Sequence, residues 1–215
     1  MNTCVIFAAG GFDSLIEPIL PEDYIIAADG GLEHTKGLGL HPDETIGDFD
    51  SLGYVPEGGV VYPVEKDDTD SMLAVKRGLA LGYRRFVLYG AMDGKRLDHT
   101  LANFQTLGYL AQHDAVGFLV GKDYLACAVK DGGLRFPAGA EGDFSLFCLG
   151  TDALGVTIRG LYYEAENAVL TSFFPLGVSN HFTGREAAVT VQDGTLLALW
   201  ERKAGFPEYI PHTLL

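Results

Sequence analysis

The chain has 215 residues, which allows one large domain or two small ones and is long enough to bury a substantial core. Hydrophobic residues make up 47% and charged residues 20% of the sequence, which excludes a disordered chain. The 15 basic and 29 acidic residues give a formal net charge of −14, the opposite of the basic footprint that a duplex DNA-binding protein needs. An acidic excess instead suits sites that hold metal ions or cationic ligands.

The cysteines and the N-terminal residues indicate where the protein works. Cys4, Cys127 and Cys148 are far apart and form no C-x-x-C pair, so the sequence predicts neither a zinc knuckle nor a disulfide framework. The apolar run at residues 4–9 ends at Gly10 and is too short for a signal peptide or a membrane span. We therefore expect a protein of the reducing cytoplasm with no membrane partner and no nucleic-acid partner.

Residues 1–125 predict an α/β domain. Continuous apolar runs at residues 4–9, 24–28, 85–89 and 116–120 are typical of buried parallel strands. Apolar residues at helical spacing predict a helix from Met72 to Tyr83. A second helix is predicted by an apolar stripe that consists of Leu97, Leu101, Phe104, Gly108 and Ala111. The alternation indicates a mainly parallel sheet that binds ligands at the carboxyl ends of its strands.

Residues 135–215 predict a small all-β domain, a sandwich in architecture. Turn-forming segments at residues 130–133, 137–142 and 192–195 alternate with short β-rich runs. These runs are residues 144–149, 155–158, 168–171, 187–191 and 196–200. The only tryptophan, Trp200, alternates in the last run and is expected in the core rather than on a ligand.

The first candidate site is Gly-Asp-Phe-Asp-Ser at residues 47–51. In an extended chain, Asp48 and Asp50 would point to the same side. Two like charges held together need a partner, and a Mg²⁺ ion with carboxylate and phosphate ligands is the usual one. The alternative is a solvated acidic loop in which one of the two aspartates caps a turn.

The second candidate site is Glu-Lys-Asp-Asp-Thr-Asp at residues 65–70, directly before the first predicted helix. Thr69 is a suitable helix N-cap, and acids favour a helix start, but a helix start needs only one or two of them. A metal ion or another cation nearby explains the density of acids better than capping alone.

The third candidate site is residues 90–100, which follow the strand at 85–89 and open the second helix. A strand, a glycine-containing loop and a helix N-terminus form a phosphate-binding geometry, and Lys95 and Arg96 supply positive charge. The segment is neither a Walker A loop nor G-x-G-x-x-G. Asp98 and Gln105 share a helix face that would look into the cleft, whereas His99 is interpreted as an ordinary capped or exposed histidine.

The order and spacing of these segments along the chain indicate the function more specifically than any single segment does. From Asp29-Gly30-Gly31 through the three sites to Gly-Val-Ser-Asn at residues 177–180, the sequence resembles the thiamine pyrophosphokinase (thiamine diphosphokinase) family. The resemblance extends from the second strand to Trp200, and Gly-Asp-Phe-Asp-Ser followed by Arg-Leu-Asp-His is its most specific part. Residues 172–177 differ from the serine-rich, basic stretch of many bacterial members, and His181 replaces a common Glu.

The resemblance implies a domain at residues 1–125 that binds ATP and Mg²⁺, and a β-sandwich at residues 135–215 that helps to bind thiamine. The implied reaction transfers the pyrophosphoryl group of ATP to the hydroxyl of thiamine, giving thiamine diphosphate and AMP. It also implies a homodimer with sites shared between subunits. A monomer whose own β half covers its own cleft is the alternative.

The same resemblance implies roles for single residues. The metal-binding and catalytic carboxylates would be Asp48, Asp50 and Asp70. The residues that line the site or bind ATP or thiamine would be Asp29, Lys66, Asp67, Thr69, Arg96, Asp98, Asn103, Ser179 and Asn180. Asp70 is the candidate that accepts or orients the hydroxyl proton of thiamine, and Ser179 and Asn180 match the thiamine side.

Two other functions remain open from the residues alone. A haloacid-dehalogenase-like phosphatase also has a D-x-D pair, but its first Asp follows the leading strand, which here ends in Gly10-Gly11. A non-enzymatic sensor with the same fold would bind thiamine and nucleotide without making AMP.

Overall fold

The computed structural model describes residues 2–49, 53–61 and 67–211, which form two compact units. Unit 1 comprises Met1–Thr106 and Gly117–Lys122, and unit 2 comprises Leu107–Val116 and Asp123–Leu215. The division runs through the longest helix, so that unit 2 contains helical residues as well as strands. No helix in the described ranges is both long and apolar enough to span a membrane.

A parallel sheet forms the centre of unit 1. Its strands are β1 (Thr3–Phe7), β2 (Tyr24–Ala28), β3 (Glu44–Gly47), β4 (Val60–Val61), β5 (Arg85–Tyr89) and β6 (Val116–Val120), in the spatial order β6-β5-β1-β2-β3-β4. β1 pairs in parallel with β2 and β5, and β3 pairs in parallel with β2 and β4. The four strands predicted from apolar runs are confirmed, and their near-complete burial is typical of a parallel sheet covered on both faces.

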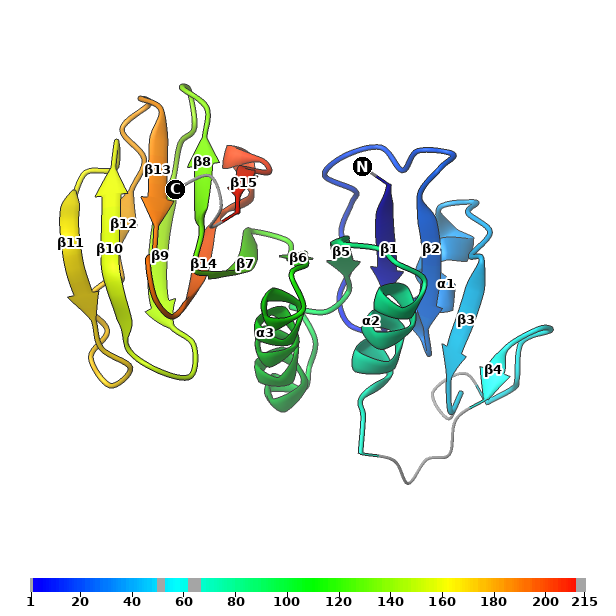
Figure 1. The fold of residues 1–215 in the computed structure, drawn as a ribbon. Coiled ribbons are helices and arrows are strands. Elements are labelled where there is room, and N and C mark those ends of the chain that lie inside the picture. Colours follow the sequence, from blue (N-terminus) through cyan, green and yellow to red (C-terminus); the bar gives the residue numbers. More distant parts are fainter. Residues whose placement is uncertain (1, 50–52, 62–66, 212–215) are drawn as a thin grey trace. The chain divides into compact units, whose positions relative to one another are not determined.

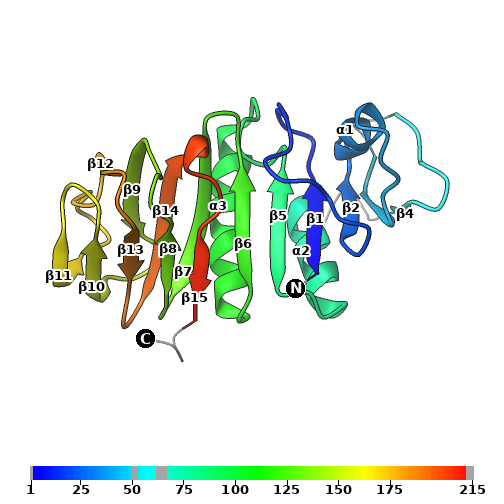
Figure 2. The ribbon, with the colours of Figure 1, turned by 90° about the horizontal axis from the view of Figure 1, so that it is seen from above.

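Three helices connect these strands: α1 (Gly31–Gly37), α2 (Asp70–Ala80) and α3 (Leu97–Gln112). Figures 1 and 2 show α1 and α2 on opposite faces of the sheet. Right-handed crossovers require this, because the chain moves outward from β2 to β3 through α1 and returns through α2 to β5, on the far side of β1. The direction reverses between β1 and β5, and ligands bind at such a point in α/β sheets.

The two predicted helices are confirmed, and the apolar stripe predicted for α3 is correct in its second half, where Gly108 and Ala111 are buried, but wrong in its first turns. Leu97 and Leu101 are 71% and 57% exposed. The buried positions of the helix include Asn103, Thr106, Leu107, Leu110 and Ala111. Asn103 and Thr106 are polar and hydrogen-bonded to backbone carbonyl groups, so a pattern based on apolar residues alone misses these buried positions.

Unit 2 contains two antiparallel sheets, one in front of the other (Figure 2). The first has the order β12-β9-β14-β7, formed by β7 (Tyr124–Lys130), β9 (Asp143–Cys148), β12 (Asn180–His181) and β14 (Thr195–Glu201). The second has the order β11-β10-β13-β8-β15, formed by β8 (Gly133–Phe136), β10 (Ala153–Arg159), β11 (Ala165–Leu170), β13 (Ala187–Thr190) and β15 (Glu208–Ile210). A short 3₁₀ helix, Arg202–Ala204, lies between β14 and β15.

Aromatic side chains fill the space between the two sheets. The ring of Phe136 on β8 lies 5.8 Å from that of Phe144 on β9 and 5.3 Å from that of Trp200 on β14, measured between centroids. Trp200 is completely buried, which confirms its predicted core position. Each of the five predicted β-rich runs corresponds to a strand, whereas β7, β8, β12 and β15 are absent from the sequence prediction.

Candidate active site

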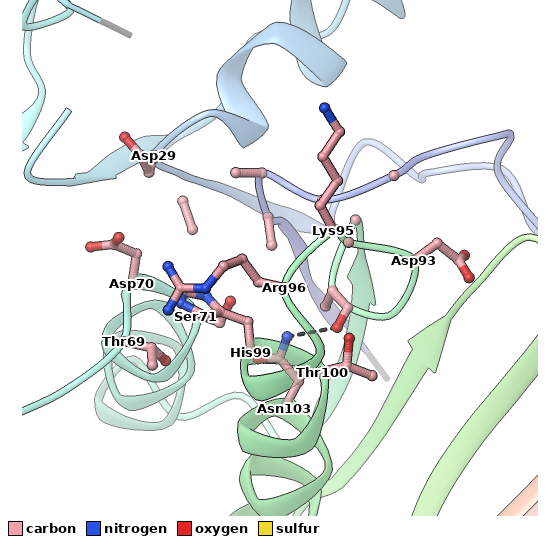
Figure 3. A pocket seen from close by; sticks show the side chains of 18 of the residues that line it. Asp29, Thr69, Asp70, Ser71, Asp93, Lys95, Arg96, His99, Thr100 and Asn103 are labelled. Carbon is pink, nitrogen blue, oxygen red and sulfur yellow. Dashed lines mark hydrogen bonds between the residues drawn. The ribbon is translucent and has the colours of Figure 1, made fainter. Parts of the chain in front are cut away.

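A cavity of about 770 Å³ lies in unit 1 at the carboxyl ends of the parallel strands. Its lining comes from the loops after β1, β2, β3 and β5 and from the starts of α2 and α3 (Figure 3). The cavity thus occupies the point where the strand order reverses. The predicted site residues that line it are Asp29, Asp48, Thr69, Asp70, Arg96 and Asn103.

Two glycine-containing loops form a wall of the cavity that consists mainly of backbone. The Gly10 N–H donates to the Gly90 carbonyl oxygen at 2.8 Å, and the Gly11 N–H donates to the Asp93 carbonyl oxygen at 3.1 Å. A Cβ atom on Gly10 would lie 2.4 Å from the Gly90 oxygen, closer than any side chain allows. Glycine is therefore required where the loops after β1 and β5 meet.

Asp29 follows β2 and is buried with a left-handed backbone, at φ 48°. Its N–H donates to the carbonyl oxygen of Ile46 in the neighbouring strand β3, at 2.8 Å. Gly47 allows the close approach of β3 to this turn, because a Cβ on Gly47 would lie 3.1 Å from the Cα of Asp29. An aspartate held in a sparsely populated conformation beside a cavity is typical of a functional position.

Asp48 lines the cavity directly after β3, but the extended geometry expected around it is wrong. Phe49 has φ 59° and a buried ring, so the chain turns sharply after Asp48 instead of continuing as a strand. The argument that Asp48 and Asp50 share one side of an extended chain therefore does not apply. Asp50 lies outside the described residues.

The acidic run before α2 serves several purposes. Thr69 Oγ1 accepts a hydrogen bond from the Met72 N–H at 3.2 Å, which confirms Thr69 as the N-cap. Both carboxylate oxygens of Asp68 lie 2.7 Å from the ammonium of Lys76, so a lysine on α2 accounts for this acid. Asp70 lines the cavity as the first residue of α2, whereas Asp67 is exposed and does not line it. Lys66 lies outside the described residues.

Arg96, directly before α3, and Asp98, in the first turn of α3, form an ion pair. Arg96 Nε lies 2.9 Å from Asp98 Oδ1, and the guanidinium hydrogen bond holds the pKa of this carboxyl at about 2. Asp98 is exposed and does not line the cavity, contrary to the helix face expected for it. In Figure 3 the Arg96 guanidinium extends toward Asp70, whereas Lys95 points the other way.

Asn103 and Thr100 fix the loop after β5 from the side of α3. Asn103 Nδ2 donates to the Ala91 carbonyl oxygen at 2.6 Å, and Thr100 Oγ1 donates to the Met92 carbonyl oxygen at 3.0 Å. Both residues also line the cavity (Figure 3). Asn103 is thus a support of the loop as well as a wall residue.

Sequence reasoning assigned no individual role to four lining residues, of which Asp93, His99 and Thr100 lie within the third candidate site and Ser71 directly follows the second. His99 is exposed, as interpreted from the sequence, but its exposed side belongs to the cavity. All four lie close in sequence to a predicted site residue. These residues could therefore be predicted from the position of their segments at a strand end or a helix start, rather than from their residue type.

The two predicted residues of the thiamine side lie in unit 2 and differ in exposure. Asn180 is buried, and its Oδ1 accepts the N–H groups of Tyr163 and His181 at 2.9 Å each, while its Nδ2 donates to the Tyr163 carbonyl oxygen at 2.8 Å. Ser179 is exposed and has φ 63°. The rings of Tyr162 and His181 stack at 4.6 Å. Asn180 therefore supports the turn that carries Tyr162 and Tyr163.

An α/β unit with carboxylates, an arginine and helix starts around one cavity, joined to a β-sandwich, defines the class: an enzyme that transfers phosphoryl groups. Two family models match this chain, the thiamin pyrophosphokinase catalytic domain at residues 12–118 and the thiamin pyrophosphokinase vitamin B1 binding domain at residues 136–196. The chain belongs to the thiamin pyrophosphokinase family. Its activity is the synthesis of thiamine diphosphate from thiamine.

Solved structures of the same family have the same fold. The thiamine pyrophosphokinase of Bacillus subtilis is 24% identical with a TM-score of 0.80, covering 93% of this chain and 99% of that one. A thiamin pyrophosphokinase family protein from Enterococcus faecalis is 26% identical with a TM-score of 0.77, covering 94% and 99%. The thiamin pyrophosphokinase of Candida albicans is 14% identical with a TM-score of 0.78, covering 93% and 88%. The sequence matches no curated protein.

Proposed function

We propose that this enzyme transfers the pyrophosphoryl group of ATP to the hydroxyl of thiamine, with Mg²⁺ as cofactor and AMP as the leaving product. The observation that carries the proposal is that one cavity in unit 1 gathers Asp48, Asp70 and Arg96 at the carboxyl ends of the strands. Transfers of this kind depend on positioning and charge neutralisation rather than on covalent intermediates. Residues 1–125 are the proposed ATP domain and residues 135–215 the proposed thiamine domain.

The donors in the cavity fit a magnesium ion. Mg²⁺ is usually held by one or two carboxylates together with phosphate oxygens and water, and Asp48 and Asp70 line the same cavity from β3 and α2. Among the described residues, no three His, Cys, Asp or Glu side chains gather as a metal site. Asp50, the third proposed ligand, lies outside this part of the chain. A bound ion would neutralise the charge on the phosphates.

Positive groups of the chain would hold the phosphate oxygens. Arg96 and Lys95 both line the cavity directly before α3, a helix of 16 residues whose first N–H groups favour anions. Asp98 orients the guanidinium of Arg96, because its carboxylate accepts hydrogen bonds from Nε and Nη2. Lys66 is proposed as a further phosphate ligand on the resemblance alone.

Asp70 is the proposed acceptor of the thiamine hydroxyl proton. It stands at the first position of α2, and its neighbour Thr69 fixes the helix start by capping it. An acceptor must lie within hydrogen-bond reach of the proton it takes. Asp29, Asp67 and Asn103 remain proposed wall or neighbouring residues, of which Asp29 and Asn103 line the cavity.

The thiamine side is proposed to be the surface around Ser179 and Asn180 in unit 2. Thiamine is a cation with aromatic rings, and aromatic side chains attract such ligands. The exposed rings of Tyr162 and Tyr163, which Asn180 supports, supply that chemistry here. In this reading Ser179 contacts thiamine, while Asn180 acts through the backbone of Tyr163.

Two copies of the chain are proposed to share each site. Phe173 is fully exposed and Phe174 is 65% exposed, and Leu176 and Val178 are exposed beside them. Apolar side chains gathered on one segment indicate an interaction surface. A second copy is the proposed partner, because a two-fold contact would bring unit 2 of one subunit to unit 1 of the other.

A cytoplasmic location is also proposed. It is supported by three free thiols, of which Cys4 and Cys127 are buried. Free thiols persist where the environment is reducing.

Identification of the products tests the reaction. Incubation of the protein with ATP, Mg²⁺ and thiamine should give AMP and thiamine diphosphate in equal amounts. ³¹P NMR identifies and quantifies both products. Excess EDTA should abolish turnover. ADP with thiamine monophosphate would contradict pyrophosphoryl transfer, and ligand binding without turnover would indicate a sensor.

A further inference from the structure

One wall of the cavity exposes almost no side-chain atoms. Residues 8–11 are Ala-Ala-Gly-Gly, so a ligand there meets methyl groups and backbone. The position of this backbone therefore determines whether the ligand fits. The N–H groups of Gly10 and Gly11 hold the segment against the loop after β5.

The carbonyl oxygen of Gly10 is held from the opposite direction. His34 Nε2, on α1, lies 2.8 Å from this oxygen. Because a carbonyl oxygen only accepts hydrogen bonds, Nε2 carries the hydrogen and donates it. The ring of Phe12 lies 5.3 Å from the imidazole ring and 5.7 Å from the ring of Tyr89, so the imidazole is packed against a fixed aromatic group.

α1 begins two residues after Asp29, which lines another wall of the cavity. A Cβ on Gly31 would lie 1.9 Å from the Phe7 carbonyl oxygen, so the start of α1 touches the end of β1 directly. His34 extends this contact from the strand to the loop that follows it. One side chain thus links the Asp29 wall to the wall of residues 8–11.

From these contacts we propose that His34 is a positioning residue for ATP. It holds residues 8–11 at the spacing from Asp29 that the nucleotide requires, and it acts through the Gly10 carbonyl because it does not itself line the cavity. This rests on the proposed function, since it takes the cavity to be the ATP site. Loss of a hydrogen bond of this kind should weaken ATP binding about three- to tenfold.

The test compares four variants of the full chain. His34→Leu removes the donor. His34→Gln places an amide nitrogen near the position of Nε2 and should replace the donor, whereas the shorter His34→Asn reaches only about the position of Nδ1 and should not. Thr35→Val is the matched control, because Thr35 is the next residue of α1 and its hydroxyl bonds within the helix, to the Leu32 carbonyl oxygen.

ATP binding in the presence of Mg²⁺ is measured by calorimetry, KM and kcat by steady-state kinetics, and amide exchange of residues 8–16 by mass spectrometry. His34→Leu and His34→Asn should raise Kd and KM for ATP about three- to tenfold, change kcat by less than about twofold, and accelerate exchange in residues 8–16. His34→Gln and Thr35→Val should match the wild type in Kd and in exchange. A merely structural role would lower stability without this split between KM and kcat.

The outcomes separate the two proposals. If the wild type binds ATP, and both His34→Leu and His34→Asn have the wild-type Kd for ATP and the wild-type amide exchange, the role of His34 is overturned and the proposed function stays in place. Equal weakening by Thr35→Val, or no rescue by His34→Gln, also overturns it. A wild-type protein that binds no ATP overturns the proposed function, and the nucleotide role of His34 with it.

Discussion

The two units present their candidate site residues in different ways. In unit 1, the residues lie around a cavity of about 770 Å³ whose loops are tied to one another by backbone and side-chain hydrogen bonds. In unit 2, Ser179 lies on an exposed surface beside apolar side chains that include the fully exposed Phe173. The candidate residues of unit 1 are preorganised around a cavity, whereas those proposed for thiamine in unit 2 lie on a surface.

This difference fits the chemistry proposed for each unit. Phosphoryl transfer needs charged groups fixed in advance, because their reorganisation would cost catalytic free energy. Binding of a flat cationic ring needs aromatic surface and enclosure, and a second surface can supply the enclosure. The comparison predicts that changes in unit 1 affect the rate of the chemical step, while changes in unit 2 affect thiamine binding and assembly.

The largest effect is expected at the carboxylates of unit 1. Asp70→Asn should lower kcat by a factor on the order of 10³ with little change in unfolding temperature, because a charge that acts only on bound phosphates and substrate is lost. Asp68→Asn is the control, since Asp68 also lines the cavity but pairs with Lys76. Steady-state kinetics and thermal unfolding check both. Similar kcat values for the two variants would contradict the role of Asp70.

Arg96 and Asp98 give the next largest effect and separate contact from support. Arg96→Gln should lower kcat about 100-fold, because a cation that stabilises phosphate charge is lost. Asp98→Asn should lower it less than about tenfold, because Asp98 only orients the guanidinium and does not line the cavity. Kinetics at saturating ATP distinguish the two. An Asp98 variant that is the more damaged of the pair would show that this carboxylate acts directly.

Unit 2 should show an assembly effect instead. Replacing both Phe173 and Phe174 by Ser should weaken self-association at least about tenfold, because the proposed dimer would lose apolar area that it buries between subunits. Sedimentation at several concentrations measures this, and ATP affinity of the same variant should stay at the wild-type value. Leu20→Ser, an exposed leucine of unit 1, is the control. Unchanged self-association would show that Phe173 and Phe174 do not form the interface between subunits.

The sequence predicts most of the fold, for identifiable reasons. Buried strands β1, β2, β5 and β6 are continuous apolar runs, and the Thr69 cap precedes α2 as expected. Leu97 and Leu101 fit the helical spacing of an apolar stripe but are exposed, whereas the polar Asn103 is buried because its side chain bonds to a carbonyl group 12 positions away in sequence. Local patterns carry no information on such a partner.

The candidate site is predicted in part. The family resemblance names Asp29, Asp48, Asp70 and Arg96 together, and all four line one cavity at the carboxyl ends of the parallel strands. The left-handed turn at Phe49 and the supporting role of Asn180 could not be predicted, since both depend on tertiary contacts. His34 is part of no motif in the sequence, and only the fold brings it next to Gly10.

The smallest effect concerns stability at the end of unit 1 away from the cavity. Arg77 on α2 donates from Nε to both oxygens of Glu44 on β3, at 2.9 and 2.8 Å, and this holds the Glu44 pKa below its usual 4.5. Such a carboxylate stabilises the fold above its unfolded pKa, and the contribution is lost as pH falls through the lower folded pKa. Glu44→Gln should cost about 1 kcal/mol near neutral pH and progressively less below about pH 4.5, measured by urea unfolding. A difference that is independent of pH would contradict the ion pair.

Subunit complementation tests most directly whether the two halves of the site come from different chains. Asp48→Asn damages unit 1 and Asn180→Ala damages unit 2, and each variant alone should be inactive. After reversible dissociation and mixing in equal amounts, about half of the dimers are mixed, and each mixed dimer has one intact site because both defects fall in the other. The account predicts recovery of about one quarter of wild-type activity. No recovery despite exchange demonstrated by mass spectrometry, or a monomeric mass of the active protein by light scattering, would contradict it.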